Sequence, residues 1–431
     1  MFRSRNNDWA HMRKIKDYFV RHLDRDNRIY FLLFAFFPGV LASAASFMLA
    51  IAFIGAMLFL YLGLFPWKIR HDQKWALYLI SAYPTIMILA VLFNEHTSMG
   101  WPWIVRVLPF FAGWFVLARI RTSPDGTLIP CMIFGAGVGM IATFVICLFQ
   151  FLFIAYRVSG GAGNAAVLGL FTVLFANIAL MNAHSRNRIE RWVAILGFCL
   201  GIASLFLSET RSAWLVLPVN LLIAVLYLQK NIKINYKKIA IPVLVGVLAA
   251  GAVFYPTINS RVQSLESDIK AFNSQPHDMT SLSIRLMVWS GGLAAFADRP
   301  LFGYGAQNRM TTVESYLPEQ LAAKIDVTHL HNAFLNVAVD AGLLGVAGLV
   351  LALAAPILAA ARKTPGPERD ASMAIALMLV ASYVITGMFG IMFGHDATDA
   401  IYITTFLVIC HGAGSSRLYP VSDQQLAGQK A

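Results

Sequence analysis

Long apolar segments separated by short charged turns recur along almost the whole chain. Hydrophobic residues make up 58% of the sequence and charged residues 13%, against roughly 45–50% and about 25% in soluble domains. A run of about 20 apolar residues is long enough for a helix to cross a membrane. A transmembrane β-barrel would instead show strict alternation over about ten residues, which this chain does not sustain. The sequence therefore predicts an all-α polytopic membrane protein with about twelve transmembrane helices.

A window of about 19 residues gives approximate bounds for the spans. Nine of them fall within residues 29–256 and three within residues 332–413. Only small residues at 42–46 separate the first two, which predicts a tight hairpin. The expected spans are 29–45, 48–66, 75–94, 102–118, 128–155, 165–183, 193–207, 214–228, 239–256, 337–361, 371–394 and 399–413.

Basic residues are concentrated in alternate turns, and Lys and Arg favour the cytoplasmic side of a membrane. The alternation of basic turns predicts a basic cytoplasmic tail at residues 1–28 and a cytoplasmic tail at 414–431. The first span is expected to be retained, because no small-residue cleavage site follows it. The net charge of +12 is spread over the turns and forms no single patch, which argues against nucleic acid as a partner. The basic turns contain Lys68, Arg70 and Lys74; Arg119 and Arg121; Arg186, Arg188 and Arg191; Lys230, Lys233, Lys237 and Lys238; and Arg362, Lys363 and Arg369.

One long polar segment, residues 257–331, falls between the ninth and tenth spans on the non-cytoplasmic side. Its charges are of both signs, so it is not a basic tail. Within it, residues 283–297 carry apolar side chains near helical spacing, which predicts an amphipathic helix close to the membrane interface. Ser281 or Ser283 could cap the start of this helix, and Asp298-Arg299-Pro300 would end it.

His331 stands where this polar loop ends and an apolar helix begins. An imidazole can accept a proton near neutral pH with little tuning, so His331 is a candidate general base. The alternative is that it only caps the helix or anchors it at the interface. His329 could serve as the base instead, but His331 is preferred because Asn332 follows it and because it begins a pattern of spaced glycines. The glycines of that pattern, Gly342, Gly345 and Gly348, recur at a spacing that predicts close helix packing.

Three arginines lie in unusual places. Arg211 has apolar neighbours on both sides, and an arginine at a membrane edge is a functional candidate; the alternative is that it reaches the surface or pairs with Glu209. Arg285 falls in the first turn of the expected loop helix, where a cation is unfavourable unless an anion binds there too. Its alternative is a solvated side chain. Arg106 lies within the fourth span and could line the same cavity.

Motifs for several other chemistries are missing from the sequence. The four cysteines, Cys131, Cys147, Cys199 and Cys410, all lie in apolar runs and predict neither a disulfide framework nor a metal site. No glycine-rich phosphate loop with Lys-Ser/Thr is present, so ATP is not expected. A Gly-x-Ser-x-Gly hydrolase motif is also missing.

Three motifs together resemble the O-antigen ligase and polymerase superfamily of bacterial envelope proteins. The first is Thr210-Arg211-Ser212-Ala213-Trp214, and the second is the segment 285–289 together with Pro300-Leu301-Phe302-Gly303-Tyr304-Gly305. The third is His331-Asn332, followed after nine residues by Gly342-x-x-Gly345, and it is most similar to the ligases. The similarity extends to the expected spans and to a late, long periplasmic loop.

The resemblance implies glycosyl transfer at the periplasmic face of the bacterial inner membrane, without a metal ion, cofactor or ATP. A glycan linked to undecaprenyl pyrophosphate would be the donor, and a sugar hydroxyl of lipid A–core the acceptor. Arg211 and Arg285 would then bind the pyrophosphate and His331 would remove the acceptor proton, with inversion at the anomeric carbon.

Three alternatives remain at this stage. Within the superfamily they are an O-antigen polymerase, whose acceptor is a second lipid-linked glycan, and a protein O-oligosaccharyltransferase. From a different class comes a twelve-span transporter, although the two halves of this chain are dissimilar and few acidic residues lie in its spans.

Overall fold

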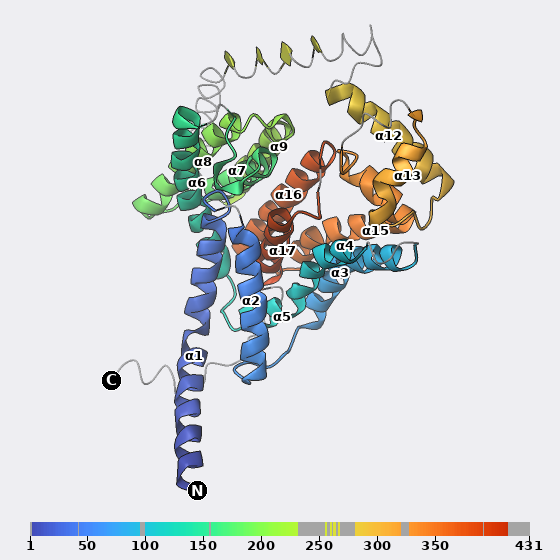
Figure 1. Ribbon diagram of the computed structural model, residues 1–431. Coiled ribbons are helices and arrows are strands. Elements are labelled where there is room, and N and C mark those ends of the chain that lie inside the picture. The colour runs from blue at the N-terminus through green and yellow to red at the C-terminus, as the bar shows by residue number, and fades with distance from the viewer. Residues whose placement is uncertain are drawn as a thin grey trace.

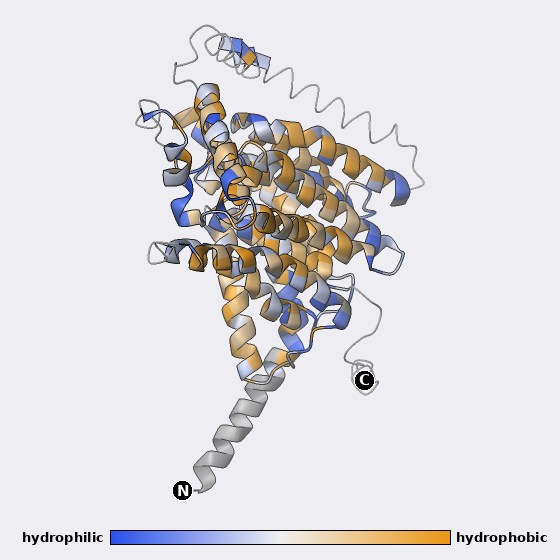
Figure 2. Cartoon of the chain, turned by 90° about the vertical axis from the view of Figure 1, so that its right-hand side faces the viewer, coloured by the Kyte–Doolittle hydropathy of each residue, from blue (hydrophilic) through white to orange (hydrophobic). Residues whose placement is uncertain are grey.

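The computed structural model describes residues 2–41, 43–94, 100–154, 157–231, 281–319, 327–390 and 392–412, with the short pairs 255–256, 259–260, 262–263 and 266–267. All regular secondary structure in these residues is helical. The predicted ninth span, much of the predicted loop and the tail at 414–431 lie outside them. Hydrophobic residues follow the helices of the bundle, and hydrophilic ones gather at its turns (Figure 2).

One group of helices, at the upper left of Figure 1, comes from the first half of the chain. α1 lies along α6, and α6 in turn packs on α7 and α8. Glycines allow the closest of these approaches, because a Cβ at Gly135 would lie 2.1 Å from the carbonyl oxygen of Leu32. The bounds are α1 Phe2–Phe36, α6 Leu128–Phe153, η3 Gly160–Ala162, α7 Ala165–Leu180, α8 Arg188–Leu207 and α9 Arg211–Asn231.

The remaining membrane helices pack around α17, almost all of whose side chains are buried. α15 lies along α3, and α16 packs against both α9 and α15. A short 3-10 segment at Pro109 joins α4 to α5, so the predicted fourth span is interrupted where proline removes a backbone donor. The bounds are α2 Ala44–Tyr61, α3 His71–Leu92, α4 Trp101–Val107, η2 Leu108–Ala112, α5 Gly113–Ile120, α15 Ala333–Ala361, α16 Pro367–Gly387 and α17 Asp396–Cys410.

Among the described residues, eight helices are long and apolar enough to cross a membrane, and α7 is a shorter apolar helix. This supports the predicted class, an all-α polytopic membrane protein. The figure of about twelve spans stays a prediction, because the ninth lies largely outside the described residues.

The start of the chain is one helix. Residues 2–28, the predicted basic tail, and the first apolar segment both belong to α1, which ends at Phe36, and the cytoplasmic placement of this tail stays a prediction. The break between the first two spans falls at 37–43, earlier than the small residues at 42–46. The two helices of this hairpin pack mainly on different neighbours, α1 on α6 and α2 on α17, so they do not form a tightly packed pair.

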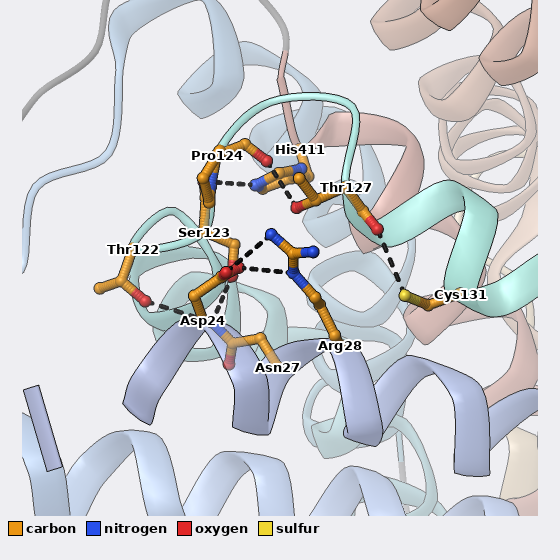
Figure 3. A network of polar contacts seen from close by, with 9 residues as sticks. All are labelled: Asp24, Asn27, Arg28, Thr122, Ser123, Pro124, Thr127, Cys131 and His411. Atoms are coloured by element: carbon orange, nitrogen blue, oxygen red, sulfur yellow. Dashed lines mark hydrogen bonds and ion pairs between the residues drawn. The ribbon is translucent and has the colours of Figure 1, made fainter. Parts of the chain in front are cut away.

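A network of polar side chains joins several elements near the N-terminal half of the bundle (Figure 3). Asn27 of α1 donates to the hydroxyl of Ser123 at 2.9 Å, and His411 lies 3.1 Å from the Ser123 carbonyl oxygen. Arg28 pairs with Asp24 at 2.8 Å. The turn between α5 and α6 and the end of α17 therefore meet α1 at the same end of the bundle.

Two further helices, α12 (Ser281–Asp298) and α13 (Arg309–Ser315), form a small layer at the upper right of Figure 1, with η4 (Ala306–Asn308) between them. The helix predicted at 283–297 is α12, and it ends at Asp298 as the sequence indicates. Its buried residues form a small core with α13 and the start of α15. That core contains Val288, Ala295, Val313, Leu330 and Val339.

Candidate active site

The site is built around a break in α15. Gly342 has φ +63° and ψ −155° inside this helix, a backbone conformation that favours glycine. The turn that follows α12 docks into the break: Leu343 N donates to the Pro300 carbonyl at 2.7 Å, and Gly305 N donates to the Asp340 carbonyl at 2.8 Å. A Cβ at Gly342 would lie 2.3 Å from the carbonyl carbon of Leu301. The second and third sequence motifs thus form one structural unit.

The predicted role of the three spaced glycines needs correction. Gly342 breaks the helix to receive a turn and does not serve packing between two helices. Gly345 faces Val337 and Ala341 of its own helix, and Gly348 approaches the backbone of Tyr83 in α3. Only Gly348 therefore fits the packing role that the spacing predicts. The three-residue spacing could not reveal that the three glycines have different roles, because those roles depend on the turn that docks at Gly342.

Three interactions fix the short segment before α15. The Leu330 N–H donates to Asn336 Oδ1 at 3.0 Å, and the Leu330 carbonyl accepts from Trp289 Nε1 of α12 at 2.7 Å. The Leu330 side chain is fully buried in the small core. These contacts fix Leu330, which lies between His329 and His331 in the chain. The packing of α12 on α15 therefore fixes the backbone that carries both imidazoles.

The two histidines lie together, with ring centroids 4.2 Å apart. His331 has φ +54°, in the left-handed region that costs a non-glycine residue roughly 1–3 kcal/mol. Asn332, and not His331, caps α15: its Oδ1 accepts from Phe334 N at 3.0 Å and Leu335 N at 3.1 Å. The alternative in which His331 serves as the helix cap is therefore wrong.

Both imidazoles are half-buried beside cations, and this disfavours their protonated forms. Burial and the Arg285 guanidinium lower the pKa of His331 below its ordinary value of 6.5. Burial, together with His331, Arg309 and Arg285, lowers the pKa of His329 to about 4. Both rings are thus neutral near pH 7 and have a nitrogen able to accept a proton.

A cavity of about 260 Å³ opens beside the histidines. His329 lines it and His331 does not, although the two rings are in contact. Arg106, the additional candidate from the sequence, also lines it, on the end of α4. The remaining wall comes mainly from α3, α4, α15 and the segment before α17, with one residue of α13. It includes Tyr83, Trp103, Arg309, Asn336, Asp340, Phe393 and Gly394.

A buried ion pair in the cavity wall was not predicted from the sequence. Arg309 Nε donates to Asp340 Oδ1 at 2.7 Å, and Arg309 Nη2 donates to Asp340 Oδ2. Asp340 has no exposed side-chain surface, and Arg309 is 9% exposed. The sequence did contain a signal for this pair, because Asp340 is a carboxylate inside an apolar span, and a charged residue there is a functional candidate by default.

Arg285 is the one predicted arginine whose charge acts on the histidines. Arg211 begins α9, after a turn in which Glu209 has φ +53° and Thr210 Oγ1 donates to the Ala165 carbonyl at 2.8 Å. The convergence of Arg211 with Arg285 and the two histidines stays a prediction.

Metal-ligating side chains do not cluster in the part of the chain that the structure describes. No group of three or more His, Cys, Asp or Glu there could hold a metal ion. The polar groups of the site are instead two imidazoles, arginines and one carboxylate already bound to an arginine.

Comparison with known proteins agrees with the motifs. Residues 196–350 match a protein family described as O-antigen ligase. A protein of Escherichia coli named O-antigen ligase is 24% identical over 196 residues, which are 44% of this chain and 46% of that protein. An uncharacterized protein of Haemophilus influenzae is 26% identical over 255 residues, 57% of this chain and 62% of that protein.

These alignments span about half to three fifths of the relatives' own lengths. The predicted resemblance to the O-antigen ligase superfamily is confirmed. The segment that matches the family contains Arg211, Arg285, His329, His331 and Asn332, so every predicted site residue except Arg106 falls inside it.

Proposed function

We propose that this protein is an O-antigen ligase that transfers a glycan from undecaprenyl pyrophosphate to a sugar hydroxyl of lipid A–core. One observation carries the proposal: a rigidly held, neutral histidine pair lies beside Arg285 at a cavity, within the segment that matches the family. A neutral imidazole can accept the proton of a hydroxyl, and arginines can bind a diphosphate.

The chemical step is a direct displacement. The acceptor oxygen forms a bond to the anomeric carbon, and the bond from that carbon to the pyrophosphate oxygen breaks. The leaving oxygen keeps the electron pair, and the hydroxyl proton passes to the imidazole. This attack inverts the anomeric configuration, and general-base assistance typically contributes about 10²–10⁴-fold.

His331 is the preferred base. The pKa of His329 is lowered to about 4, which leaves its imidazole a poor proton acceptor at neutral pH. Burial and the Arg285 guanidinium also lower the pKa of His331, and His331 is preferred because it forms the His331-Asn332 motif. In this proposal His331 takes the proton, and His329, which lines the cavity, contacts the His331 ring.

Arg285 is proposed to stabilise the negative charge that grows on the leaving pyrophosphate, without a metal ion or ATP. Arg211 is proposed to share this role because it lies in the first family motif, and Arg106 because it lines the cavity. The protein would act in the bacterial inner membrane with both termini in the cytoplasm and this site facing the periplasm.

An O-antigen polymerase is the nearest alternative, since the same superfamily contains both activities and a protein O-oligosaccharyltransferase as well. The name of the Escherichia coli relative favours the ligase. A transporter is disfavoured because Arg285 and Arg309 lie on α12 and α13, which are not among the helices long and apolar enough to cross a membrane.

A deletion strain tests the proposal. Loss of a ligase should leave long polymer on the lipid carrier and lipid A–core without O-antigen. Loss of a polymerase should instead leave single repeat units on the core. Complementation with the wild-type chain should restore full-length lipopolysaccharide, and complementation with His331→Asn should not.

A further inference from the structure

Arg119 is a cation in an apolar helical segment, and the candidate active site does not use it. It lies in the last turn of α5, within the segment Trp101–Ile120 that is long and apolar enough to cross a membrane. The residue is half-buried. A charge in such a segment is costly unless something satisfies it, so an arginine here is a functional candidate.

The described residues leave the guanidinium of Arg119 incompletely satisfied. Its Nε atom is buried and has no hydrogen-bond partner among them. Asp26 of α1 is the carboxylate whose charge acts on Arg119, but Asp26 forms its ion pair with Arg25, at 3.3 Å. The ring of Phe59 lies 5.1 Å from the Arg119 Cζ atom, and a ring face attracts a cation without replacing an anion. A buried donor of this kind indicates a partner that comes from outside the chain.

Gly55 of α2 provides the space in which this guanidinium lies. A Cβ at Gly55 would lie 2.9 Å from Arg119 Nη1. Gly55 and Phe59 are one helical turn apart and both half-buried, so they lie on the same side of α2. That side borders the exposed face of the helix, whose large side chains are Phe47, Ile51, Ile54, Met57, Leu58 and Tyr61. The charged end of Arg119 therefore reaches the edge of an apolar, lipid-facing surface.

Aromatic residues place this position near a membrane interface. Helices α2 and α5 pack on each other (Figure 1). Phe115 lies one turn before Arg119 on α5, and its ring stacks on the exposed Trp67, with centroids 5.8 Å apart. Trp67 Nε1 also donates to the Trp114 carbonyl at 3.0 Å, which fixes the turn after α2 onto α5. Tryptophan is enriched where a membrane meets water, so Arg119 lies near the depth of lipid head groups.

We propose that Arg119 binds the phosphate of an anionic phospholipid that lies against α2. The phosphate oxygens accept from the guanidinium, and the acyl chains lie along the exposed face of α2. Basic pockets between membrane helices bind anionic head groups in the same way. The site lies outside the segment 196–350 that matches the family, and it does not depend on the proposed function.

The choice of an anionic phospholipid follows from the two halves of the site. Inorganic phosphate has the same charge chemistry, but it makes no contact with the apolar face of α2. A zwitterionic lipid has the acyl chains, but its head group has no net charge to offset that of Arg119.

Native mass spectrometry of the full-length protein, released from detergent, tests the proposal by measuring the affinity for the first bound phosphatidylglycerol. Phosphatidylcholine with the same acyl chains and inorganic phosphate at the same concentration are the comparison ligands. Arg119→Gln should weaken phosphatidylglycerol binding about tenfold, the effect of one charge-assisted hydrogen bond, and leave phosphatidylcholine binding unchanged. Gly55→Leu keeps the charge but fills the space beside Nη1, and it should weaken phosphatidylglycerol binding by a similar factor.

Arg362→Gln is the matched control. Arg362, at the end of α15, is also an arginine over an aromatic ring, with its Cζ atom 3.9 Å from the centroid of Trp75, but it is exposed. Its loss should change the affinity less than twofold. Wild-type affinity for phosphatidylglycerol in either folded variant, Arg119→Gln or Gly55→Leu, would overturn the proposal. Equal binding of phosphatidylcholine by the wild type, or displacement of phosphatidylglycerol by inorganic phosphate, would overturn it too.

Discussion

The polar network of Figure 3 and the candidate active site use similar residues for opposite purposes. In the network, Asn27 and His411 both bond to Ser123, and these side chains connect parts of the fold. At the active site, His329 and Arg106 line a cavity and His331 contacts His329, while hydrogen bonds of Leu330 fix the backbone between the two histidines. Buried polar groups thus mark function only where their bonding capacity is left open.

The largest expected effect separates the histidines of these two regions. His331→Ala and His331→Asn should each lower the transfer rate about 10²–10⁴-fold, because neither side chain can accept the acceptor's proton. His411→Asn should leave the rate per folded molecule unchanged, since His411 serves only the network. Transfer to purified lipid A–core measures both, and equal losses at the two positions would remove the distinction.

The next effect concerns ion pairs of different burial. Asp340→Asn leaves Arg309 buried without its counter-charge and should destabilise the protein by about 3–5 kcal/mol. The partner of Asp370 is Lys230, whose side chain is 67% exposed, so Asp370→Asn should cost no more than about 1 kcal/mol. Thermal unfolding in detergent compares the two variants. Similar midpoints would show that the Arg309–Asp340 pair does not hold the site together.

A smaller effect distinguishes arginines by the geometry of their contacts. Arg285→Lys and Arg211→Lys should lose most of the transfer activity, on the order of tenfold or more, because lysine keeps the charge but not the two-pronged donor group. The Arg28→Lys variant should keep its transfer activity, since Arg28 forms an ion pair with Asp24 in the network of Figure 3. Normal transfer by both variants, Arg285→Lys and Arg211→Lys, when correctly inserted in the membrane, would assign both arginines a structural role.

The smallest effect is a shift in pH dependence. Protonation of His331 removes the base, so transfer should fall as the pH drops through a pKa below the ordinary 6.5. Arg285 is one cause of the lowered pKa, so Arg285→Gln should raise it and move the acid limb of the profile to higher pH. The residual kcat of this variant, followed against pH, is the measurement. An acid limb that moves to lower pH would contradict the electrostatic coupling.

The features that could be predicted from the sequence are those that depend on residues close together in the chain. Apolar spacing and a terminating Asp-Arg-Pro placed α12 within two residues of its observed ends. The membrane class followed from the length of the apolar runs. Arg285 and His331, chosen from their places at a helix start and a loop end, do lie in electrostatic contact.

Features that depend on contacts distant in sequence escaped prediction. The Arg309–Asp340 pair joins residues 31 positions apart, and it exists because the turn after α12 docks at the Gly342 break. No periodicity marks such a docking. Likewise, the position of His329 at the cavity and its contact with His331 depend on the hydrogen bond that Leu330 makes to Asn336, and no local preference predicts it.

The central claim is that His331 performs metal-independent glycosyl transfer. The most direct test measures transfer from an undecaprenyl-pyrophosphate-linked glycan to lipid A–core by purified wild-type, His329→Ala and His331→Asn proteins, each with and without EDTA. The account predicts activity in the wild type that EDTA leaves unchanged, substantial activity in His329→Ala, and a rate about 10²–10⁴-fold lower in His331→Asn. A folded His331→Asn protein working near the wild-type rate, or activity lost with EDTA and restored by a divalent ion, would contradict it.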